Sequence, residues 1–286
     1  MPVNTIAALV RAGALRLAEA GVPDPQVDAE LLAGHVLSMS RGEVQAAIVR
    51  HDAIADSDIT AFEALIERRS GREPLQHITG IAPFRHLELA VGPGVFVPRP
   101  ETETVVQYAI DALLSDADPS PIGVDLGTGS GAIALALATE VPHARIYAAE
   151  LSPDAFAWAE RNAEGITNLT LVNVDLAHAF PELNGTASVV ISNPPYVPDA
   201  AVPRDPEVRL FDPALALYGG EDGLDVVRVL SARGLELLRR GGLLVIEHGE
   251  LQGEQIRTIL TADGWRSAST HRDLTLRDRA TTAIRP

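Results

Sequence analysis

The feature that most constrains the fold is a regular alternation of apolar runs and amphipathic segments that begins after Pro121. The apolar runs have the length of buried strands, and the segments between them have the spacing of helices. Such alternation predicts a parallel sheet covered by helices, because successive parallel strands are joined by crossover connections. The expected elements are, in chain order, strand 122–126, helix 132–140, strand 145–149, helix 153–163, and strands 169–174, 189–191 and 243–246.

Residues from Trp265 onward are expected to add a closing antiparallel pair to this sheet. Aromatic residues make up only 4% of the chain, so its cores must be built mainly from Ala, Val, Leu and Ile. That composition suits helices packed on a parallel sheet better than a β-sandwich. With 286 residues, the chain is long enough for one substantial domain and a smaller one.

The N-terminal segment has a different pattern, in which helical spacing is interrupted by capping and stop signals. The expected helices begin at Asn4 or Thr5, at Asp24 with Pro25 in its first turn, and at Asp56 or Ser57, with stops at Gly21 and Gly71. The glycines, prolines and alternating residues that follow suggest a hairpin. We therefore expect a helical bundle at 1–72, a β-hairpin connector at 73–97 and an α/β domain at 98–286.

Charge and composition exclude several classes of function. The 23 basic and 39 acidic side chains give a net charge of −16, which disfavours broad binding to a phosphate backbone. The chain has no cysteine, so disulfides, thiolate catalysis and thiolate-bound zinc are excluded. The first residues lack the apolar region of a signal peptide, and no run approaches ~20 apolar residues. A cytoplasmic protein with no membrane segment is expected.

The sequence DLGTGSG at 125–131 lies between a predicted strand and a predicted helix. Doubly wound folds open their ligand crevice at this kind of position. Gly127, Gly129 and Gly131 allow positive φ and a close approach of the backbone to a ligand, and the helix end offers free N–H groups. The turn is therefore expected to bind a polar ligand.

Three ligands compete for this turn. A triphosphate is disfavoured because the GK[ST] ending is missing. A dinucleotide fits Glu150, which follows about 20 residues later as a ribose-binding acid should, but the glycine spacing is GxGxG rather than GxGxxG. S-adenosylmethionine also has a ribose, and an acidic site tolerates its sulfonium charge better than it tolerates a pyrophosphate. A purely structural turn remains an alternative.

The sequence SNPPY ends the fourth expected strand. Pro194 and Pro195 remove two N–H donors and stiffen the backbone, so the Asn193 side-chain oxygen and the Pro194 carbonyl can be fixed acceptors. Two acceptors match one NH2 group. An amide nitrogen is a poor nucleophile, and holding both of its N–H bonds turns its lone pair toward an incoming methyl group. Tyr196 is expected to pack against the amide plane.

These motifs, together with PLQHITG at 74–80, FVPRPETE at 96–103 and GGEDGLD at 219–225, resemble the release factor glutamine methyltransferase family over nearly the whole chain. The resemblance implies a class I methyltransferase fold with a mostly parallel seven-stranded sheet. It implies S-adenosylmethionine as donor, S-adenosylhomocysteine as product and no metal. It also implies a glutamine in the Gly-Gly-Gln motif of peptide chain release factors as acceptor, and an N-terminal domain that recognises the release factor.

Site residues carry over from this resemblance position by position. The donor would contact the glycine turn, the ribose acid, the end of the third strand and the start of NPPY, namely Gly127, Thr128, Gly129, Ser130, Gly131, Glu150, Asp175, Leu176 and Asn193. The glutamine would contact Asn193, Pro194, Pro195 and Tyr196, with Asn193, Pro194 and Tyr196 as the catalytic set. Two positions depart from the family: Glu150 stands where relatives often have Asp, and Leu176 where they often have an aromatic residue.

Three further polar residues have less specific interpretations. Arg99 and Glu101 lie on a rigid turn and suit either a substrate contact or a surface ion pair, and Arg99 is counted with the expected substrate-binding residues. His248 is interpreted as structural, because amide methylation needs no general base.

Alternatives to this function remain open. They are glutamine methylation of a ribosomal protein, methylation of a nucleic-acid base, and a binding module without activity. The expected protein is a monomer that acts on a protein substrate and does not bind nucleic acid directly.

Overall fold

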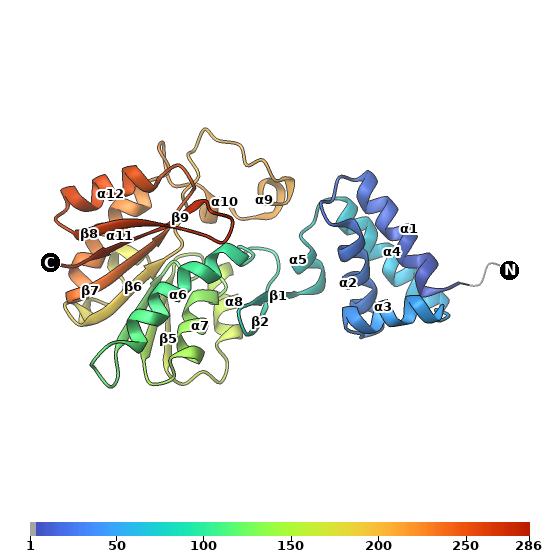
Figure 1. The fold of residues 1–286 in the computed structure, drawn as a ribbon, viewed down its shortest axis with the longest axis horizontal. Helices are drawn as coiled ribbons and strands as arrows, with labels where there is room; N and C mark the ends of the chain where they lie inside the picture. The colour runs from blue at the N-terminus through green and yellow to red at the C-terminus, as the bar shows by residue number, and fades with distance from the viewer. Residues whose placement is uncertain (1–3) are drawn as a thin grey trace. The chain divides into compact units, whose positions relative to one another are not determined.

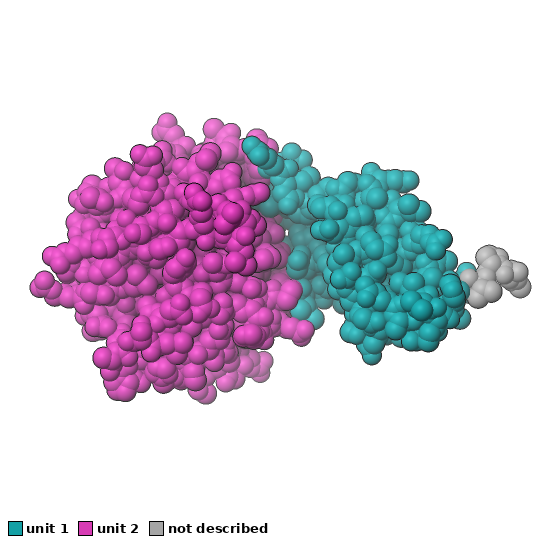
Figure 2. All heavy atoms as spheres, in the orientation of Figure 1, with its two compact units in different colours: residues 1–81, 204–211 teal, residues 82–203, 212–286 magenta. Residues whose placement is uncertain are grey.

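The computed structural model describes residues 4–286, which form two compact units (Figures 1 and 2). Unit 1 extends to Ile81 and includes the distant segment Arg204–Phe211. Unit 2 contains Ala82–Pro203 and Asp212–Pro286. The chain therefore leaves unit 2 after Pro203, adds one short helix to unit 1 and returns at Asp212.

Unit 1 is a bundle of helices around a small apolar core. Its helices are α1 (Ile6–Glu19), α2 (Pro25–Leu37), α3 (Arg41–Arg50), α4 (Asp56–Ser70), α5 (Leu75–Thr79) and α9 (Pro206–Phe211). Leu17, Leu32, Val44 and Phe62 are almost fully buried in this core. A Cβ at Gly13 would lie 2.7 Å from the Phe62 ring, so only glycine permits α1 to approach α4 this closely.

The capping signals account for the starts of several helices. The Thr5 hydroxyl accepts a hydrogen bond from Ala8 N and begins α1, as the sequence predicts. Ser40 and Glu43 form a reciprocal capping box that begins α3. Helix α3 was not predicted, although the Ser-x-x-Glu spacing was the signal available for it. Helix α5 was not predicted either, and it extends unit 1 beyond the expected boundary at residue 72 to Ile81.

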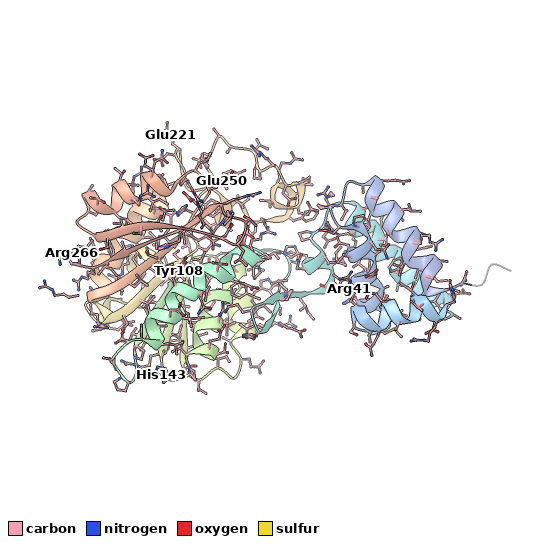
Figure 3. The ribbon with its side chains drawn as sticks, in the orientation of Figure 1. Arg41, Tyr108, His143, Glu221, Glu250 and Arg266 are labelled. Carbon is pink, nitrogen blue, oxygen red and sulfur yellow. The ribbon has the colours of Figure 1, made fainter. Side chains whose placement is uncertain are left out.

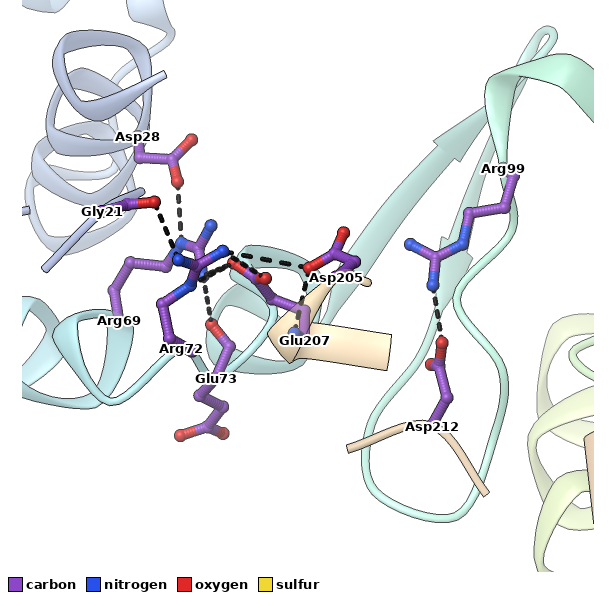
Figure 4. A network of polar contacts seen from close by, with 9 residues as sticks. All are labelled: Gly21, Asp28, Arg69, Arg72, Glu73, Arg99, Asp205, Glu207 and Asp212. Carbon is purple, nitrogen blue, oxygen red and sulfur yellow. Dashed lines mark hydrogen bonds and ion pairs between the residues drawn. The ribbon is translucent and has the colours of Figure 1, made fainter. Parts of the chain in front are cut away.

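A buried ion-pair cluster holds the segment 204–211 in unit 1 (Figure 4). Arg69 donates to Asp28 at 2.7 Å and to Glu207 at 2.8 Å. Arg72 donates to both oxygens of Glu207, at 2.8 and 2.6 Å, and to Gly21 O at 2.7 Å. Burial raises the pKa of Glu207, but hydrogen bonds from the two guanidinium groups outweigh it, so this pKa lies well below its usual value.

Unit 2 contains a seven-stranded sheet in the order β5-β4-β3-β6-β7-β9-β8. Its strands are β3 (Ile122–Leu126), β4 (Arg145–Glu150), β5 (Leu169–Asn173), β6 (Ala187–Ser192), β7 (Leu238–Glu247), β8 (Arg266–Arg272) and β9 (Asp278–Ile284). The first five are parallel, while β9 pairs antiparallel with β7 and β8. The predicted fold class and its closing antiparallel pair are thus confirmed.

Helices cover both faces of this sheet (Figure 1). One core contains apolar residues of α6 (Pro100–Leu114) and α7 (Ala132–Glu140), and the other contains those of α11 (Asp225–Leu237) and α12 (Gly253–Ala262). Tyr108 of α6 is labelled in Figure 3. The centroid of its ring lies 4.5 Å from that of His271 on β8. On the second face, Trp265 packs against α11 at Gly234, where a Cβ would lie 3.1 Å from the indole.

The remaining elements of unit 2 are short or lie at the edge of the sheet. They are the hairpin β1 (Ile81–Phe84) and β2 (Leu87–Ala90), α8 (Pro153–Asn162), α10 (Ala214–Leu217), and the 3₁₀ turns η1 (Leu176–His178) and η2 (Pro181–Leu183). The hairpin begins at the boundary between the units, which falls after Ile81, and lies inside the segment 73–97 expected to connect them. Across residues 4–286, none of the helices has the length and apolar character needed to cross a bilayer.

The ion-pair cluster predicts a specific loss of stability. Glu207→Gln leaves Arg69 and Arg72 with one buried carboxylate fewer, and removing one partner of a buried pair destabilises by about 3–5 kcal/mol. The measurement is the free energy of unfolding of unit 1 in urea at neutral pH. The control is Asp52→Asn, which breaks the exposed pair with Arg50 and is expected to change stability by less than about 1 kcal/mol.

The same contribution should depend on pH in a defined direction. Because the pKa of Glu207 in the folded state lies below the usual 4.5, its stabilisation is present above that value and is lost as pH falls through it toward the folded-state pKa. The Glu207→Gln protein should lose less stability than the wild type over this acidic window. An equal loss in both proteins would show that the cluster does not hold unit 1 together.

Candidate active site

The two main motifs of the sequence meet at one edge of the sheet. The glycine turn (residues 127–131) follows β3, and the NPPY segment (residues 193–196) follows β6, the parallel neighbour of β3. The Ser192 hydroxyl donates to the Leu126 carbonyl at 2.5 Å and ties the two strand ends together. The strand order also reverses here, with β4 and β5 on one side of β3 and β6 and β7 on the other. Ligand crevices of doubly wound sheets form at such reversal points.

The glycines of the turn have two different roles. Gly127, Gly129 and Gly131 have φ of 80°, 58° and 87°, which other residues rarely adopt. A Cβ at Gly127 or Gly129 would meet nothing within 4 Å, so the space beside them is open. A Cβ at Gly131 would lie 3.2 Å from Leu135 and 3.6 Å from Ala159. Gly131 therefore permits close packing of α7 and α8, whereas the other two glycines border open space.

Glu150, at the end of β4, is buried and shapes the glycine turn. One carboxylate oxygen accepts from Gly129 N at 2.8 Å, and the other accepts from Ser152 N at 2.8 Å. Each oxygen retains a second lone pair. The carboxylate can therefore hold the turn and still accept a hydrogen bond from a hydroxyl in the crevice.

Asp125, the last but one residue of β3, is a buried carboxyl that the sequence analysis did not select. Its Oδ2 accepts from the Thr128 hydroxyl at 2.5 Å and from Ala134 N at 3.2 Å. Burial raises the pKa of Asp125 to about 7, and the charge of Glu150 adds to the rise. The hydrogen bond from the Thr128 hydroxyl to Asp125 thus fixes the conformation of the glycine turn.

The other expected donor contacts lie close to the same edge. Ser130 is buried, and its carbonyl accepts from Asn162 Nδ2 at 2.9 Å. Asp175 follows β5, and its side chain accepts from Ala177 N at 2.9 Å, so it caps η1. Leu176 packs partly buried against the core on the second face of the sheet.

The backbone is rigid where the chain leaves β6, from Asn193 onward. Asn193 is half-buried, and its Nδ2 donates to the Thr102 hydroxyl at 3.4 Å. Pro194 is buried. The Tyr196 carbonyl accepts from Gln252 Nε2 at 3.0 Å, and Val197 N donates to Leu217 O at 2.8 Å. The backbone of the segment is therefore fixed from two sides.

The GGEDGLD motif packs directly against this backbone. A Cβ at Gly219 would lie 2.5 Å from Pro195 O, and a Cβ at Gly223 would lie 2.3 Å from Tyr196 O. Gly223 also has φ of 75°. Neither position accepts a side chain without moving the NPPY segment. The two motifs, about 25 residues apart in sequence, are thus one structural element.

Tyr196 remains a neutral phenol at physiological pH. Burial raises the pKa of Tyr196 to about 12, and the nearby carboxyl of Glu247 adds to the rise while Arg279 opposes it. The hydroxyl therefore keeps its proton and can donate a hydrogen bond.

Arg99 forms an ion pair within unit 2 (Figure 4). Its guanidinium donates to Asp212 at 2.6 Å and lies 4.7 Å from the centroid of the Phe96 ring. An ion pair with a buried carboxylate is therefore present, and a contact of Arg99 with substrate stays a prediction. Arg99 connects the turn before α6 to Asp212, where the chain re-enters unit 2.

His248 is engaged inside the protein through both ring nitrogens. Nδ1 lies 2.8 Å from Gly249 O, and Nε2 lies 2.9 Å from the Thr281 hydroxyl. A carbonyl only accepts, so Nδ1 carries the proton of the neutral ring and Nε2 accepts. Burial lowers the pKa of His248, which favours this neutral form. These contacts give His248 a structural role.

Two buried residues beside Asn193 were also missed. Thr102 lies in the first turn of α6, and Glu247 is the last residue of β7. Both are buried, at 4% and 1% exposure, and Thr102 lowers the pKa of Glu247. The available signals were the PETE sequence and an acidic residue at the end of an otherwise apolar strand.

Family models match both units. Residues 8–80 match the PrmC N-terminal domain, and residues 93–228 match the methyltransferase small domain. A methyltransferase structure from Pyrococcus furiosus aligns with a TM-score of 0.50 at 18% identity, over 78% of this chain and 96% of that one, which shows a shared fold.

Full-length relatives identify the family. A 4-amino-L-phenylalanine/4-methylamino-L-phenylalanine methyltransferase of Streptomyces pristinaespiralis is 37% identical over 91% of this chain and 87% of its own length. A release factor glutamine methyltransferase of Streptomyces coelicolor is 50% identical over 98% of both chains. With that identity from end to end, and with the glycine turn beside NPPY at the reversal point of the sheet, the chain belongs to the release factor glutamine methyltransferase family.

Proposed function

We propose that this enzyme transfers a methyl group from S-adenosylmethionine to the side-chain amide nitrogen of the glutamine in the Gly-Gly-Gln motif of peptide chain release factors. The observation that carries the proposal is the orientation of Asn193. Its Nδ2 is directed at Thr102, and its Oδ1 accepts no hydrogen bond from residues 4–286. An unused amide oxygen at the crevice edge, next to a proline carbonyl, is suited to accept from an NH2 group.

The proposed donor site fits S-adenosylmethionine on two observations. Open space borders Gly127 and Gly129, where backbone could approach the methionine part of the donor. Glu150 is held by two backbone N–H groups and retains lone pairs for the ribose hydroxyls. Asp175 and Leu176, after the neighbouring strand, are assigned to the adenine. When bound, the donor supplies a methyl carbon on a positively charged sulfur, to which the amide nitrogen bonds as the sulfur–carbon bond breaks.

The protein's own contribution to this step is orientation. Asn193 Oδ1 and the Pro194 carbonyl accept from the two N–H bonds of the glutamine and turn its lone pair out of conjugation. Correct orientation can supply about 7–11 kcal/mol of a barrier. Tyr196 packs against the amide plane and excludes water. No base is required, because the nitrogen becomes acidic only as it acquires the methyl group and can then release a proton to solvent.

Unit 1 is proposed to recognise the release factor. It contains none of the residues assigned to the donor or to the glutamine. Its segment 204–211 is, however, continuous in sequence with the chain that follows NPPY, and Glu207 anchors that segment. The main chain would thus connect unit 1, through the segment 204–211, to the loop that follows the acceptor site.

The donor assignment has a direct test. Isothermal titration calorimetry is expected to detect binding of S-adenosylhomocysteine and none of NAD, because the turn has the spacing GxGxG followed by Glu150. Glu150→Ala should weaken the binding, since the ribose loses its acceptor and the turn loses the hydrogen bond from Gly129 N. Binding of NAD with no response to S-adenosylhomocysteine would reject this donor.

The acceptor mechanism is tested at Asn193. Asn193→Ala should retain donor binding and lower kcat by about 10²–10³-fold, the usual effect of removing one positioned polar group from a transition state. Transfer of labelled methyl from the donor to purified release factor measures it. Replacing the acceptor glutamine by glutamate should abolish labelling, because a carboxylate has no nitrogen to methylate.

Parallel reactions with ribosomal proteins, DNA and 4-amino-L-phenylalanine test the competing acceptors. Preferential labelling of any of these would replace the release factor as substrate. An Asn193→Ala protein with the wild-type rate would instead reject amide orientation by Asn193.

The contact between GGEDGLD and NPPY gives a steric test. Gly219 has no positive φ, so Gly219→Ala adds only a methyl group, 2.5 Å from Pro195 O. We expect a loss of about 1–3 kcal/mol in stability and about 10²-fold in kcat, since displacement by 1 Å can have this effect. Gly42→Ala is the control, because its Cβ meets nothing within 4 Å. Equal activity of the two variants would show that the NPPY position is not limiting.

A further inference from the structure

We propose that Thr102 and Glu247 form a hydrogen-bonded relay that sets which end of the Asn193 amide faces the substrate. Both are positioning residues, since they act on the substrate only through Asn193. The inference rests on the proposed function for the identity of the acceptor, but the relay itself is a property of this chain and can be measured without substrate.

The topology of unit 2 brings the three residues together. β6 and β7 are parallel neighbours, with Ser192 opposite Ile246. The next residues along these strands are Asn193 and Glu247, which therefore leave the same edge of the sheet side by side. Thr102 lies above them in the first turn of α6, a helix that packs on both strands.

The hydrogen bonds of the relay have a required direction. Asn193 Nδ2 can only donate, so the Thr102 oxygen accepts at 3.4 Å. The relay assigns the single proton of the Thr102 hydroxyl to the Glu247 carboxyl, which is buried and whose pKa Thr102 lowers. In this direction Glu247 is an ionised acceptor, and Asn193 Oδ1 faces the crevice.

A protonated Glu247 permits the opposite direction of both hydrogen bonds in the relay. The carboxylic acid donates to Thr102, Thr102 donates to Asn193 Oδ1, and Nδ2 then faces the crevice. An NH2 group there would meet the NH2 group of the substrate and could not accept from it. An ionised Glu247 thus allows only the substrate-accepting orientation of Asn193, whereas a protonated Glu247 allows the substrate-rejecting one as well.

The surroundings of Glu247 allow both states near neutral pH. Its Oε2 is buried and accepts no hydrogen bond from residues 4–286. Burial raises the pKa of Glu247 to about 7, although Thr102 and the Arg279 charge oppose the rise. The polar and charged groups that face it come from α6, the NPPY segment, β9 and the β8–β9 turn, and are Glu101, Thr102, Tyr196, Arg279 and Asp273.

The relay can be observed directly by NMR. In protein with ¹⁵N-labelled asparagine, the side-chain NH2 signals of Asn193 are assigned by their loss in Asn193→Ala. Between pH 6 and 8 the chemical shifts of these signals should follow the titration of Glu247. The reason is that the hydrogen bond of Asn193 Nδ2 changes when Glu247 gains or loses its charge. The shift should vanish in Glu247→Gln and in Thr102→Val. Unshifted signals in the wild type, or a shift that survives both substitutions, would overturn the relay whatever the substrate is.

Kinetics with release factor provide the second measurement. Thr102→Val keeps the shape of the side chain but removes the hydroxyl, and should lower kcat by about 10–100-fold with a smaller change in KM. Thr102→Ser restores the hydroxyl and should recover most of this loss. Thr104→Val is the matched control on the same helix, because Thr104 is half-buried and makes no side-chain hydrogen bond within residues 4–286.

The pH profile separates positioning from a structural role. Wild-type kcat should rise with pH through the titration of Glu247, since the ionised form is the active one. In Glu247→Gln this rise should be lost. Asp125 also has a pKa of about 7 and is unchanged in the variant, so any residual slope there is assigned to Asp125.

The outcomes distinguish this inference from the proposed function. A Glu247→Gln profile identical to the wild type, or a Thr102→Val protein as active as Thr104→Val, would overturn the relay. Absence of release factor labelling by the wild type, with the NMR shift present, would overturn the proposed substrate and leave the relay in place.

Discussion

The parallel register of β3, β6 and β7 is the constraint on which the rest of the proposed active site depends. It brings the ends of three strands to one edge, so that residues far apart in sequence become neighbours: the glycine turn after β3, Asn193 after β6 and Glu247 on β7. The Ser192 hydroxyl reinforces this arrangement by bonding to the end of β3. A slip of one residue in β6 would turn Asn193 to the opposite face of the sheet. Buried, almost entirely apolar strands on two packed faces make such a slip very unfavourable.

Backbone packing then converts this register into a rigid acceptor site. The NPPY segment has lost two N–H groups to proline, so it cannot be held by an ordinary ladder of hydrogen bonds. It is held instead by Gly219 and Gly223, whose missing side chains allow direct contact with its carbonyls, and by the Gln252 side chain. This explains why a glycine-rich motif about 25 residues later accompanies NPPY in the chain. Stiffness at the acceptor site comes from close packing of two backbones as much as from the prolines themselves.

The sequence predicted the sheet, its alternating helices and the two main motifs, because these depend on periodicity and on local turn chemistry. It did not predict α3, whose apolar pattern is weak, or the inclusion of residues 204–211 in unit 1, which depends on ion pairs between residues more than 130 positions apart. It also assigned all three glycines of the turn to a ligand, and did not predict that Gly131 permits helix packing as well. Thr102 and Glu247 were not selected from the sequence, because their proximity to Asn193 is created by the order of the strands. The ligand contacts of the selected site residues remain predictions.

Substrate choice is a separate question from the chemistry at this edge. A relative that is 37% identical over most of the chain is named for 4-amino-L-phenylalanine and its methylamino derivative. The nitrogen of an aromatic amine is, like that of an amide, conjugated with a π-system, so both acceptors require the lone pair to be turned out of conjugation. A crevice built to orient an N–H group can therefore serve more than one nitrogen acceptor without a change of mechanism. In the proposed function, selection of the release factor is assigned to the helical unit, which includes the segment 204–211 held by Arg69, Arg72 and Glu207.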